Sequence, residues 1–216
     1  SKFEAQYLQR QVFVSNRIKT MNESIYYSVD KIHVAISANA KIRFQYVEWT
    51  VTKETRVRKN GAFYEISPWA LNWDDENYYL IGYDDEAKMI KHYRVDKIVK
   101  LEVTEEKREG KEYFNKFDTG SYAKRTFGMY GGEEESVKLK CDNYLAGAII
   151  DRFGKDITIR SFDEDYFIAI VPVNISAQFY GWVLGLGNGV IIISPHQVVE
   201  GFKEHVSAVM ANYFNS

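Results

Sequence analysis

The pattern of hydrophobic positions predicts a helix near the start of the chain and a β-rich region after it. Four aliphatic residues recur at spacings of four, three and four: Ile25, Val29, Ile32 and Ile36. This spacing predicts a helix with one apolar face that docks on another element. From residue 41 the period changes to two, with Ile42, Phe44 and Tyr46 alternating with polar residues, so a strand is expected there.

The same alternation predicts several more strands in the first half of the chain. They are expected near residues 55–58, 63–67, 78–83 and 89–94, with a last strand over residues 100–107. Turn-forming sequences separate them, namely KNG (59–61), DDEN (74–77) and YDDEAK (83–88). Val95 and Ile98 lie three residues apart, which fits one tight helical turn before the last strand. This order is that of a small SH3-like or Sm-like β-barrel over residues 41–108.

The second half of the chain has a different pattern. A charged stretch over residues 109–136 is expected to form a linker around one short helix. Residues 137–216 then read as strand, helix, strand, strand, helix, strand and a final helix, and the order βαββαβ is that of a ferredoxin-like fold. The final helix carries an apolar stripe that should lie on the domain or on a partner chain: Val199, Phe202, Val206, Val209 and Tyr213. The expected fold class is α+β, preceded by a helical linker or dimerisation segment over residues 1–40.

Composition and charge narrow the classes of protein. With 216 residues, of which 45% are hydrophobic and 27% charged, the chain is typical of globular proteins. A net charge of −2 excludes a globally basic nucleic-acid coat, so any attraction for phosphate must come from a local arrangement. Cys141 is the single cysteine and favours a reducing compartment. No apolar run approaches the roughly 20 residues that span a bilayer, and no signal peptide is recognisable, so a cytoplasmic protein is expected.

The sequence offers little support for catalysis or metal binding. The four histidines do not have metal-ligand spacing, and tetrahedral zinc needs clustered nitrogen and sulfur ligands. The glycines of GLGNG (185–189) follow an expected helix and precede an expected strand, which is the reverse of a dinucleotide-binding loop. We therefore expect no enzyme activity, no catalytic residues, no metal and no cofactor.

Aromatic and basic residues are the features that do indicate a site. The 16 tyrosines and 13 phenylalanines exceed what two small cores need, so some rings should line a surface groove. Four basic side chains follow the strand near residues 78–83 closely: Lys91, His92, Arg94 and Lys97. They form either a solvated face or a site for a negatively charged ligand. Aromatic rings beside cations suit nucleobases by stacking and phosphates by charge-assisted hydrogen bonds.

The stretch ISPWALNWDDENYYLIGYDDEAKMIKHYRVDKI (66–98) resembles the WYL domain of bacterial transcriptional regulators. The Trp-Tyr-Leu that names the family corresponds to residues 78–80, which are Tyr, Tyr and Leu here. The family signature R-x-F-R-x-x-R corresponds to residues 91–97, with lysine at the first and last arginine positions. Tyr46 and Pro68 also match. The segments VKLKCDNYLAGAIIDRFG and VPVNISAQFYGWVLGLGNGVIIISP resemble the C-terminal extension that commonly follows WYL domains.

This resemblance implies a function in gene regulation. WYL barrels sense a ligand, in several members single-stranded DNA or another nucleotide-type molecule, and pass the signal to an N-terminal winged helix-turn-helix that binds operator DNA, usually as a homodimer. That DNA-binding domain is not expected within this sequence, in agreement with a start at Ser1 inside the apparently helical stretch SKFEAQYLQRQVFV. Lys91 and Lys97 keep the positive charge but lose the planar fork of arginine, which Arg94 retains.

We therefore expect a non-enzymatic, effector-sensing and dimerisation region that binds an anionic nucleotide-type or single-stranded nucleic-acid ligand. The expected ligand-binding residues are Tyr46, Arg58, Tyr64, Tyr79, Lys91, His92, Tyr93, Arg94 and Lys97. The alternative is an SH3-like protein-interaction module that binds a peptide segment. Nucleic acid should bind with strong salt dependence and a peptide largely without it. The expected partners also include a second copy of the chain, which light scattering at micromolar concentration tests, and no membrane.

Overall fold

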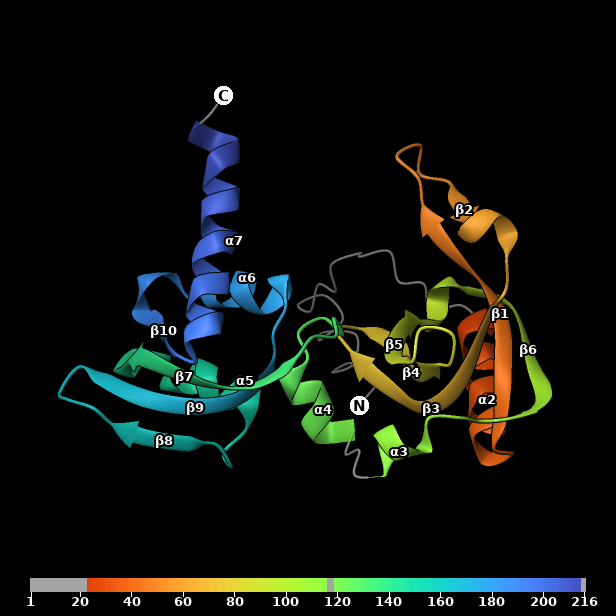
Figure 1. Ribbon diagram of the computed structural model, residues 1–216, viewed down its shortest axis with the longest axis horizontal. Helices are drawn as coiled ribbons and strands as arrows, with labels where there is room; N and C mark the ends of the chain where they lie inside the picture. The colour runs from red at the N-terminus through yellow and green to blue at the C-terminus, as the bar shows by residue number, and fades with distance from the viewer. Residues whose placement is uncertain (1–22, 116–118, 215–216) are drawn as a thin grey trace, which may run out of the picture.

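The chain forms two lobes, each built on its own antiparallel sheet (Figure 1). The computed structural model describes residues 23–115 and 119–214. The architecture is mixed α+β, as expected from the sequence. The helix expected within SKFEAQYLQRQVFV lies outside the described residues.

The first lobe combines one helix with a six-stranded sheet. Its elements are α2 (Glu23–Ser37), β1 (Ala40–Trp49), β2 (Thr55–Val57), the 3-10 turn η1 (Lys59–Gly61), β3 (Tyr64–Asp74), β4 (Asn77–Asp84), β5 (Met89–Arg94), the 3-10 turn η2 (Val95–Lys97) and β6 (Ile98–Lys107). The helix α2 and the tight turn η2 confirm the two helical predictions for this region. In α2, Ile25 and Ile32 are buried against the sheet, with Val29 and Ile36 beside them.

The first sheet curls because β1 pairs with different strands along its two edges. Along one edge β1 pairs with β6, and along the other it pairs with β3 through residues 42–44 and with β2 through residues 47–49. Its register against β6 shifts twice, between Ala40 and Ile42 and between Arg43 and Gln45. Such irregularities bend a strand and increase its twist. The result is a curled half-barrel whose concave side holds the core of the lobe.

The β3–β4 hairpin agrees with the sequence in its turn but not in its length. Asp75 and Glu76 both have positive φ, 42° and 61°, which is typical of the two-residue type I′ turn that matches strand twist. β3 was expected to end at residue 67, yet it continues to Asp74. Proline cannot donate to a ladder and usually interrupts a strand. Here the pairing with β4 shifts register between Pro68 and Ala70, so the strand passes the proline.

The segment between the lobes is packed rather than extended. It contains α3 (Lys111–Phe114) and α4 (Thr119–Arg125), so two short helices replace the single one expected. Phe114 stacks on Trp69 with the ring centroids 4.9 Å apart, which fixes α3 against β3. Gly110 precedes α3 at φ 78°, and a Cβ there would lie 2.3 Å from the ring of Tyr83. Only glycine allows the backbone at this position to lie so close to the Tyr83 ring.

The second lobe has the expected βαββαβ order. Its elements are β7 (Glu134–Asp142), the 3-10 turn η3 (Asn143–Leu145), α5 (Ala146–Phe153), β8 (Thr158–Ser161), β9 (Tyr166–Asn174), α6 (Ala177–Gly185), the 3-10 turn η4 (Gly187–Gly189), β10 (Val190–Ser194) and α7 (His196–Phe214). The strand order is β10-β7-β9-β8, with every neighbouring pair antiparallel.

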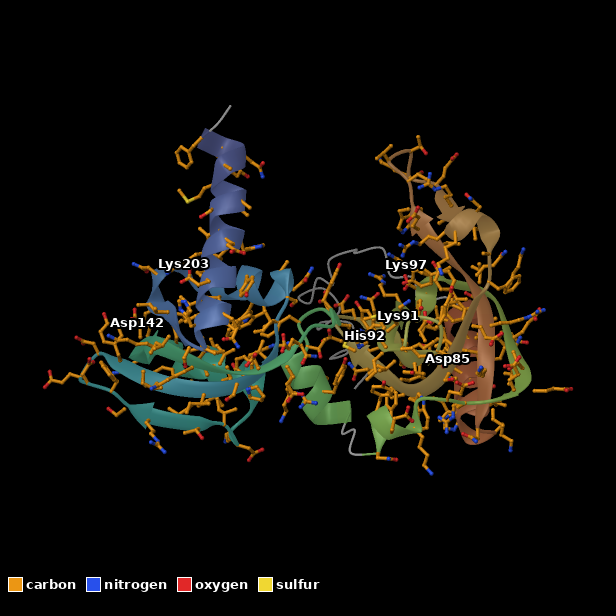
Figure 2. All side chains as sticks on the ribbon, in the orientation of Figure 1. Asp85, Lys91, His92, Lys97, Asp142 and Lys203 are labelled. Carbon is orange, nitrogen blue, oxygen red and sulfur yellow. The ribbon has the colours of Figure 1, made fainter. Side chains whose placement is uncertain are left out.

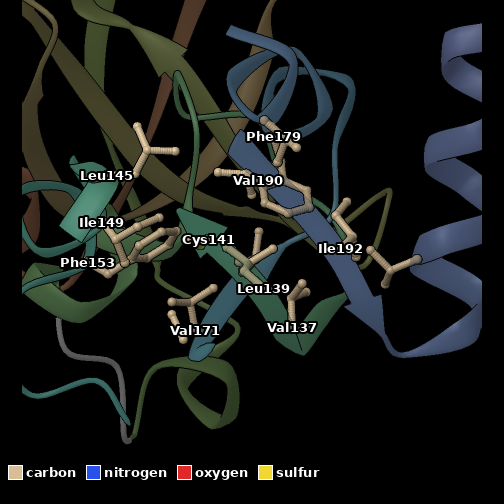
Figure 3. Close-up of a cluster of buried hydrophobic side chains, with 14 of the residues drawn as sticks. Val137, Leu139, Cys141, Leu145, Ile149, Phe153, Val171, Phe179, Val190 and Ile192 are labelled. Carbon is tan, nitrogen blue, oxygen red and sulfur yellow. The ribbon is translucent and has the colours of Figure 1, made fainter. Parts of the chain in front are cut away.

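The core of the second lobe lies between this sheet and α5 and α6 (Figure 3). Alternate residues of β7, Val137, Leu139 and Cys141, point into it and are fully buried. From the helices, Ile149 and Phe179 complete the packing. Burial raises the pKa of the Cys141 thiol to about 12, so this cysteine acts as a small apolar side chain.

The last helix, α7, packs through its first half only. Val198 is buried, and Val199 and Phe202 lie against the core of the second lobe. The second half extends away from the sheet (Figure 1), and its apolar side chains are exposed: Val209, Met210, Tyr213 and Phe214. The predicted apolar stripe is therefore divided between the domain core and an uncovered end. Among the described helices, none has the length and apolar character to cross a membrane.

Candidate functional site

Four aromatic rings fill the concave side of the first sheet. Phe44, Tyr46, Tyr64 and Tyr93 lie with their ring centroids between 5.1 and 6.4 Å apart. The Tyr46 hydroxyl accepts a hydrogen bond of 3.1 Å from the backbone N–H of Arg94, and burial raises the pKa of Tyr46 to about 12. Three of the tyrosines expected to bind ligand are thus also structural members of this core.

The hydroxyl of Tyr93 differs from that of Tyr46. It is buried and has no hydrogen-bond partner in the part of the chain that the structure describes. Burial raises the pKa of Tyr93, so the hydroxyl keeps its proton. Because leaving a buried polar group unpaired costs free energy, such a group in a folded protein calls for an explanation. The ring of Tyr93 belongs to the buried core, and the residue also borders the cleft described next.

An open cleft with a volume of about 940 Å³ lies between the first lobe and residues 131–134, which lead into the second. On the first lobe it is lined by Arg58 and Lys59 at the start of η1, by Tyr64 at the start of β3, and by Lys88 with β5 as far as Tyr93. From the linker and second lobe come Tyr113, Tyr122 and Asn174. The cations that line the cleft are Arg58, Lys59, Lys88 and Lys91, and the carboxylates are Glu133 and Glu134. The cleft is therefore rich in cations and aromatic rings.

The four cations have different surroundings: Lys59 lies with Nζ 4.5 Å from the centroid of the Tyr64 ring, and the other three contact carboxylates. Lys91 is bound by Asp84, with Nζ 2.6 Å from Oδ2, and that carboxylate is only 8% exposed. Burial alone would raise the pKa of Asp84, but hydrogen bonds from Lys91 and from the Ala87 amide lower it overall. Arg58 lies 3.3 Å from Glu48 at the surface, and Lys88 pairs with Asp85 at the surface as well. Exposed pairs of this kind contribute little stability, so these two cations can exchange their partners for a ligand.

The structure brings five of the nine expected residues to the cleft and leaves four outside. Those that line it are Arg58, Tyr64, Lys91, His92 and Tyr93. Those that do not are Tyr46, Tyr79, Arg94 and Lys97. The separation of Lys91 from Arg94 follows from their spacing, because side chains three positions apart in a strand point to opposite faces.

Arg94 is also engaged within its own loop. Its guanidinium donates to both oxygens of Asp96, at 3.0 and 2.8 Å, and it lies beside Tyr79 on the neighbouring strand. Lys97 belongs to η2 and does not line the cleft, whereas Lys91 and His92 do (all three are labelled in Figure 2). The three bases of the family signature therefore do not converge on one point.

Sequence reasoning missed the residues that turns and the linker supply. Lys59 and Lys88 both have positive φ, at 50° and 52°, in turns that the sequence did predict. What it could not show is that both turns open toward the same cleft. Glu133, Glu134 and Asn174 come from the second lobe, so only the packing of the two lobes makes them part of the site.

His92 connects the first lobe to the linker. Its Nε2 lies 3.0 Å from the hydroxyl of Tyr122 in α4, and the two rings are tilted with their centroids 5.6 Å apart. Burial lowers the pKa of His92 to about 4, so the imidazole is neutral at physiological pH. A neutral ring can keep this hydrogen bond without placing a buried charge beside the cleft.

Stability should depend on pH through His92. Its folded-state pKa of about 4 lies below the usual value of 6.5, so between these values the unfolded chain binds a proton that the folded chain does not. The free energy of unfolding should therefore fall as the pH drops through this window, by up to about 1.4 kcal/mol per pH unit. We expect His92→Phe to remove this contribution in urea titrations. The difference between wild type and variant should be constant above pH 7, and a difference that stays constant down to pH 4 would contradict the assignment.

Comparison with known proteins identifies both lobes. Residues 28–103 match the WYL domain family and residues 133–210 match the WCX domain family. Among solved structures, the proteasome accessory factor B/C (PafBC) of Arthrobacter aurescens matches with 16% identity and a TM-score of 0.39, over 90% of this chain and 28% of that one. A CRISPR Cas-related protein matches with 15% identity and a TM-score of 0.46, over 88% of this chain and 52% of that one.

This chain thus spans about half or less of each of these two solved proteins. A search of curated proteins found no match. The two family matches cover the described elements from the middle of α2 to β6 and from the start of β7 into α7. The chain therefore contains a WYL domain at residues 28–103 and, after it, a WCX domain at residues 133–210.

Proposed function

We propose that this chain is the effector-sensing region of a bacterial DNA-binding transcriptional regulator, and that an anionic nucleotide-type or single-stranded nucleic-acid ligand binds in the cleft between the two domains. The proposal involves no catalytic step and no cofactor. In this proposal the WYL domain is an SH3-like barrel, because β1 pairs with other strands along both of its edges. The WCX domain is ferredoxin-like, because its strand order is β10-β7-β9-β8.

The observation that carries the proposal is a cleft that contains three surface-accessible cations beside aromatic rings. Arg58, Lys59 and Lys88 can each donate charge-assisted hydrogen bonds to phosphate oxygens. The rings of Tyr113 and Tyr122 offer surfaces on which bases can stack.

The remaining parts of the proposal concern assembly. We propose that operator DNA is bound by a separate winged helix-turn-helix, because nothing in the described residues presents a recognition helix beside a basic surface. We also propose a homodimer, which is usual for regulators that bind two-fold symmetric sites. The exposed apolar end of α7 offers a surface for the second copy.

Filling the cleft should weaken binding without disturbing the fold. A Cβ at Gly131 would meet only His92 Cε1 at 3.8 Å, an ordinary contact, so the position accepts a side chain that projects toward the cleft. We expect Gly131→Gln to weaken binding of a labelled single-stranded oligodeoxynucleotide at least about tenfold, equivalent to 1.4 kcal/mol. Fluorescence anisotropy measures this affinity.

The matched control is Gly147→Gln. Gly147 is an exposed residue of α5 with nothing within 4 Å of its Cβ position, and it lies away from the cleft. Its variant should bind the oligonucleotide as wild type does. Equal affinities for the two variants would remove the cleft from the proposal, and affinity that does not change with salt would favour a peptide-binding module instead.

A further inference from the structure

The two walls of the cleft carry opposite charges. Arg58, Lys59 and Lys88 lie on the wall formed by the WYL domain. Glu133 and Glu134 at the start of the WCX domain and Asn174 at the end of β9 form the opposite wall. A uniformly anionic ligand would be repelled by the second wall, so the cleft is suited to a ligand with two chemically different ends.

The acidic wall is held in place by the backbone of the WCX domain. The carbonyl of Glu133 accepts a hydrogen bond of 2.9 Å from the Ile175 amide. A Cβ at Gly132 would lie 2.0 Å from the Ile175 carbonyl oxygen, so the two segments touch at this glycine. Asn174 is 4% exposed and donates to Thr126 Oγ1 at 3.0 Å. The wall is therefore a formed surface rather than a loose loop.

The two carboxylates of this wall are not equivalent. One oxygen of Glu134 lies 2.6 Å from the guanidinium of Arg125, which neutralises it. Glu133 is exposed, and no ion pair involves it among the described residues. An ionised carboxylate has two oxygens that accept hydrogen bonds and no proton to donate. Glu133 is therefore the group that can recognise a ligand with two adjacent N–H donors.

We infer that the ligand of this cleft contains guanine, with its phosphate on the WYL wall and its Watson–Crick edge on Glu133. This inference rests on the proposed function and adds the identity of the base to it. Guanine presents N1–H and the exocyclic amino group side by side, which matches the two oxygens of a carboxylate. Adenine and cytosine each present one amino group beside an acceptor nitrogen, and uracil and thymine present one N–H between two carbonyls that a carboxylate repels.

The contribution of the amino group can be tested with mononucleotides. Inosine 5′-monophosphate lacks only that group, so it loses one hydrogen bond to the charged carboxylate of Glu133. Isothermal titration calorimetry should therefore show that guanosine 5′-monophosphate binds about tenfold to a hundredfold more tightly than inosine 5′-monophosphate. Glu133→Gln should reduce this ratio to about threefold or less. The affinity for inosine monophosphate should also fall, because its N1–H donates to the same carboxylate, but it should fall less than the affinity for guanosine monophosphate.

The control is Glu105→Gln, which removes the same charge from an exposed position of β6 away from the cleft. It should leave the guanosine-to-inosine ratio unchanged. Equal affinities for the two nucleotides, with salt-dependent binding retained, would overturn the guanine assignment while the anion site stands. A ratio that Glu133→Gln does not alter would also overturn it. If neither nucleotide nor a single-stranded oligonucleotide binds, the proposed function fails as well.

Discussion

Replacement of Phe44 by alanine is expected to lower the free energy of unfolding by about 3–5 kcal/mol. The side chain is fully buried in the WYL domain. It stacks on Tyr64 with ring centroids 5.6 Å apart and meets Tyr93 edge-on at 5.1 Å. Its removal deletes a large apolar group and leaves a cavity between rings that the rest of the sheet cannot close. Urea denaturation followed by tryptophan fluorescence measures the loss.

The same substitution at Phe63 provides the control. That side chain is 43% exposed and lies under the guanidinium of Arg43, so Phe63→Ala should cost no more than about 1 kcal/mol. Comparable losses for the two variants would show that the four-ring cluster does not stabilise the domain. Because Tyr64 and Tyr93 also line the cleft, Phe44→Ala should weaken ligand binding even at temperatures where the variant stays folded.

Local chemistry explains which parts of the fold could be predicted from the sequence. The apolar stripe of α2 and the two-residue turn at Asp75 and Glu76 are encoded within a few residues, and both were found where expected. The length of β3 was not found as expected, because Pro68 is typical of the end of a strand. Only the register shift opposite β4 shows how the strand continues.

The candidate site could be predicted from the sequence to a smaller extent than the fold. The period of β5 already indicates that Lys91 and Arg94 face opposite sides of the sheet, so the family signature alone does not define one anion site. Their acidic partners, Asp84 and Asp96, lie seven and two residues away in sequence. The pairing is therefore local, but its geometry is visible only in the fold. Convergence of η1, β5 and the linker on one cleft depends on contacts between distant segments, which periodicity cannot report.

Removing the three surface cations of the cleft together should have the largest effect on binding. The triple variant Arg58→Ala, Lys59→Ala and Lys88→Ala should bind a single-stranded oligodeoxynucleotide about a thousandfold more weakly, since each lost charge-assisted contact costs at least about 1.5 kcal/mol. The slope of log affinity against log salt should become less negative by about 2, from roughly 0.7 for each phosphate contact. Lys91 is left in place because its removal would leave the buried carboxylate of Asp84 without its partner.

The matched control removes the same charge elsewhere. Lys53 and Lys100 are exposed lysines with positive φ, as Lys59 and Lys88 are, and Arg160 is an exposed arginine on the WCX sheet. Alanine at these three positions should leave both the affinity and the salt slope close to wild type, because none of them lines the cleft. Arg94→Ala should also have little effect on binding, since the guanidinium is held by Asp96 outside the cleft. If the control triple weakens binding as much as the cleft triple, the attraction is a property of overall charge and the cleft is not the site. If Arg94→Ala has the larger effect, the ligand lies on the opposite face of β5.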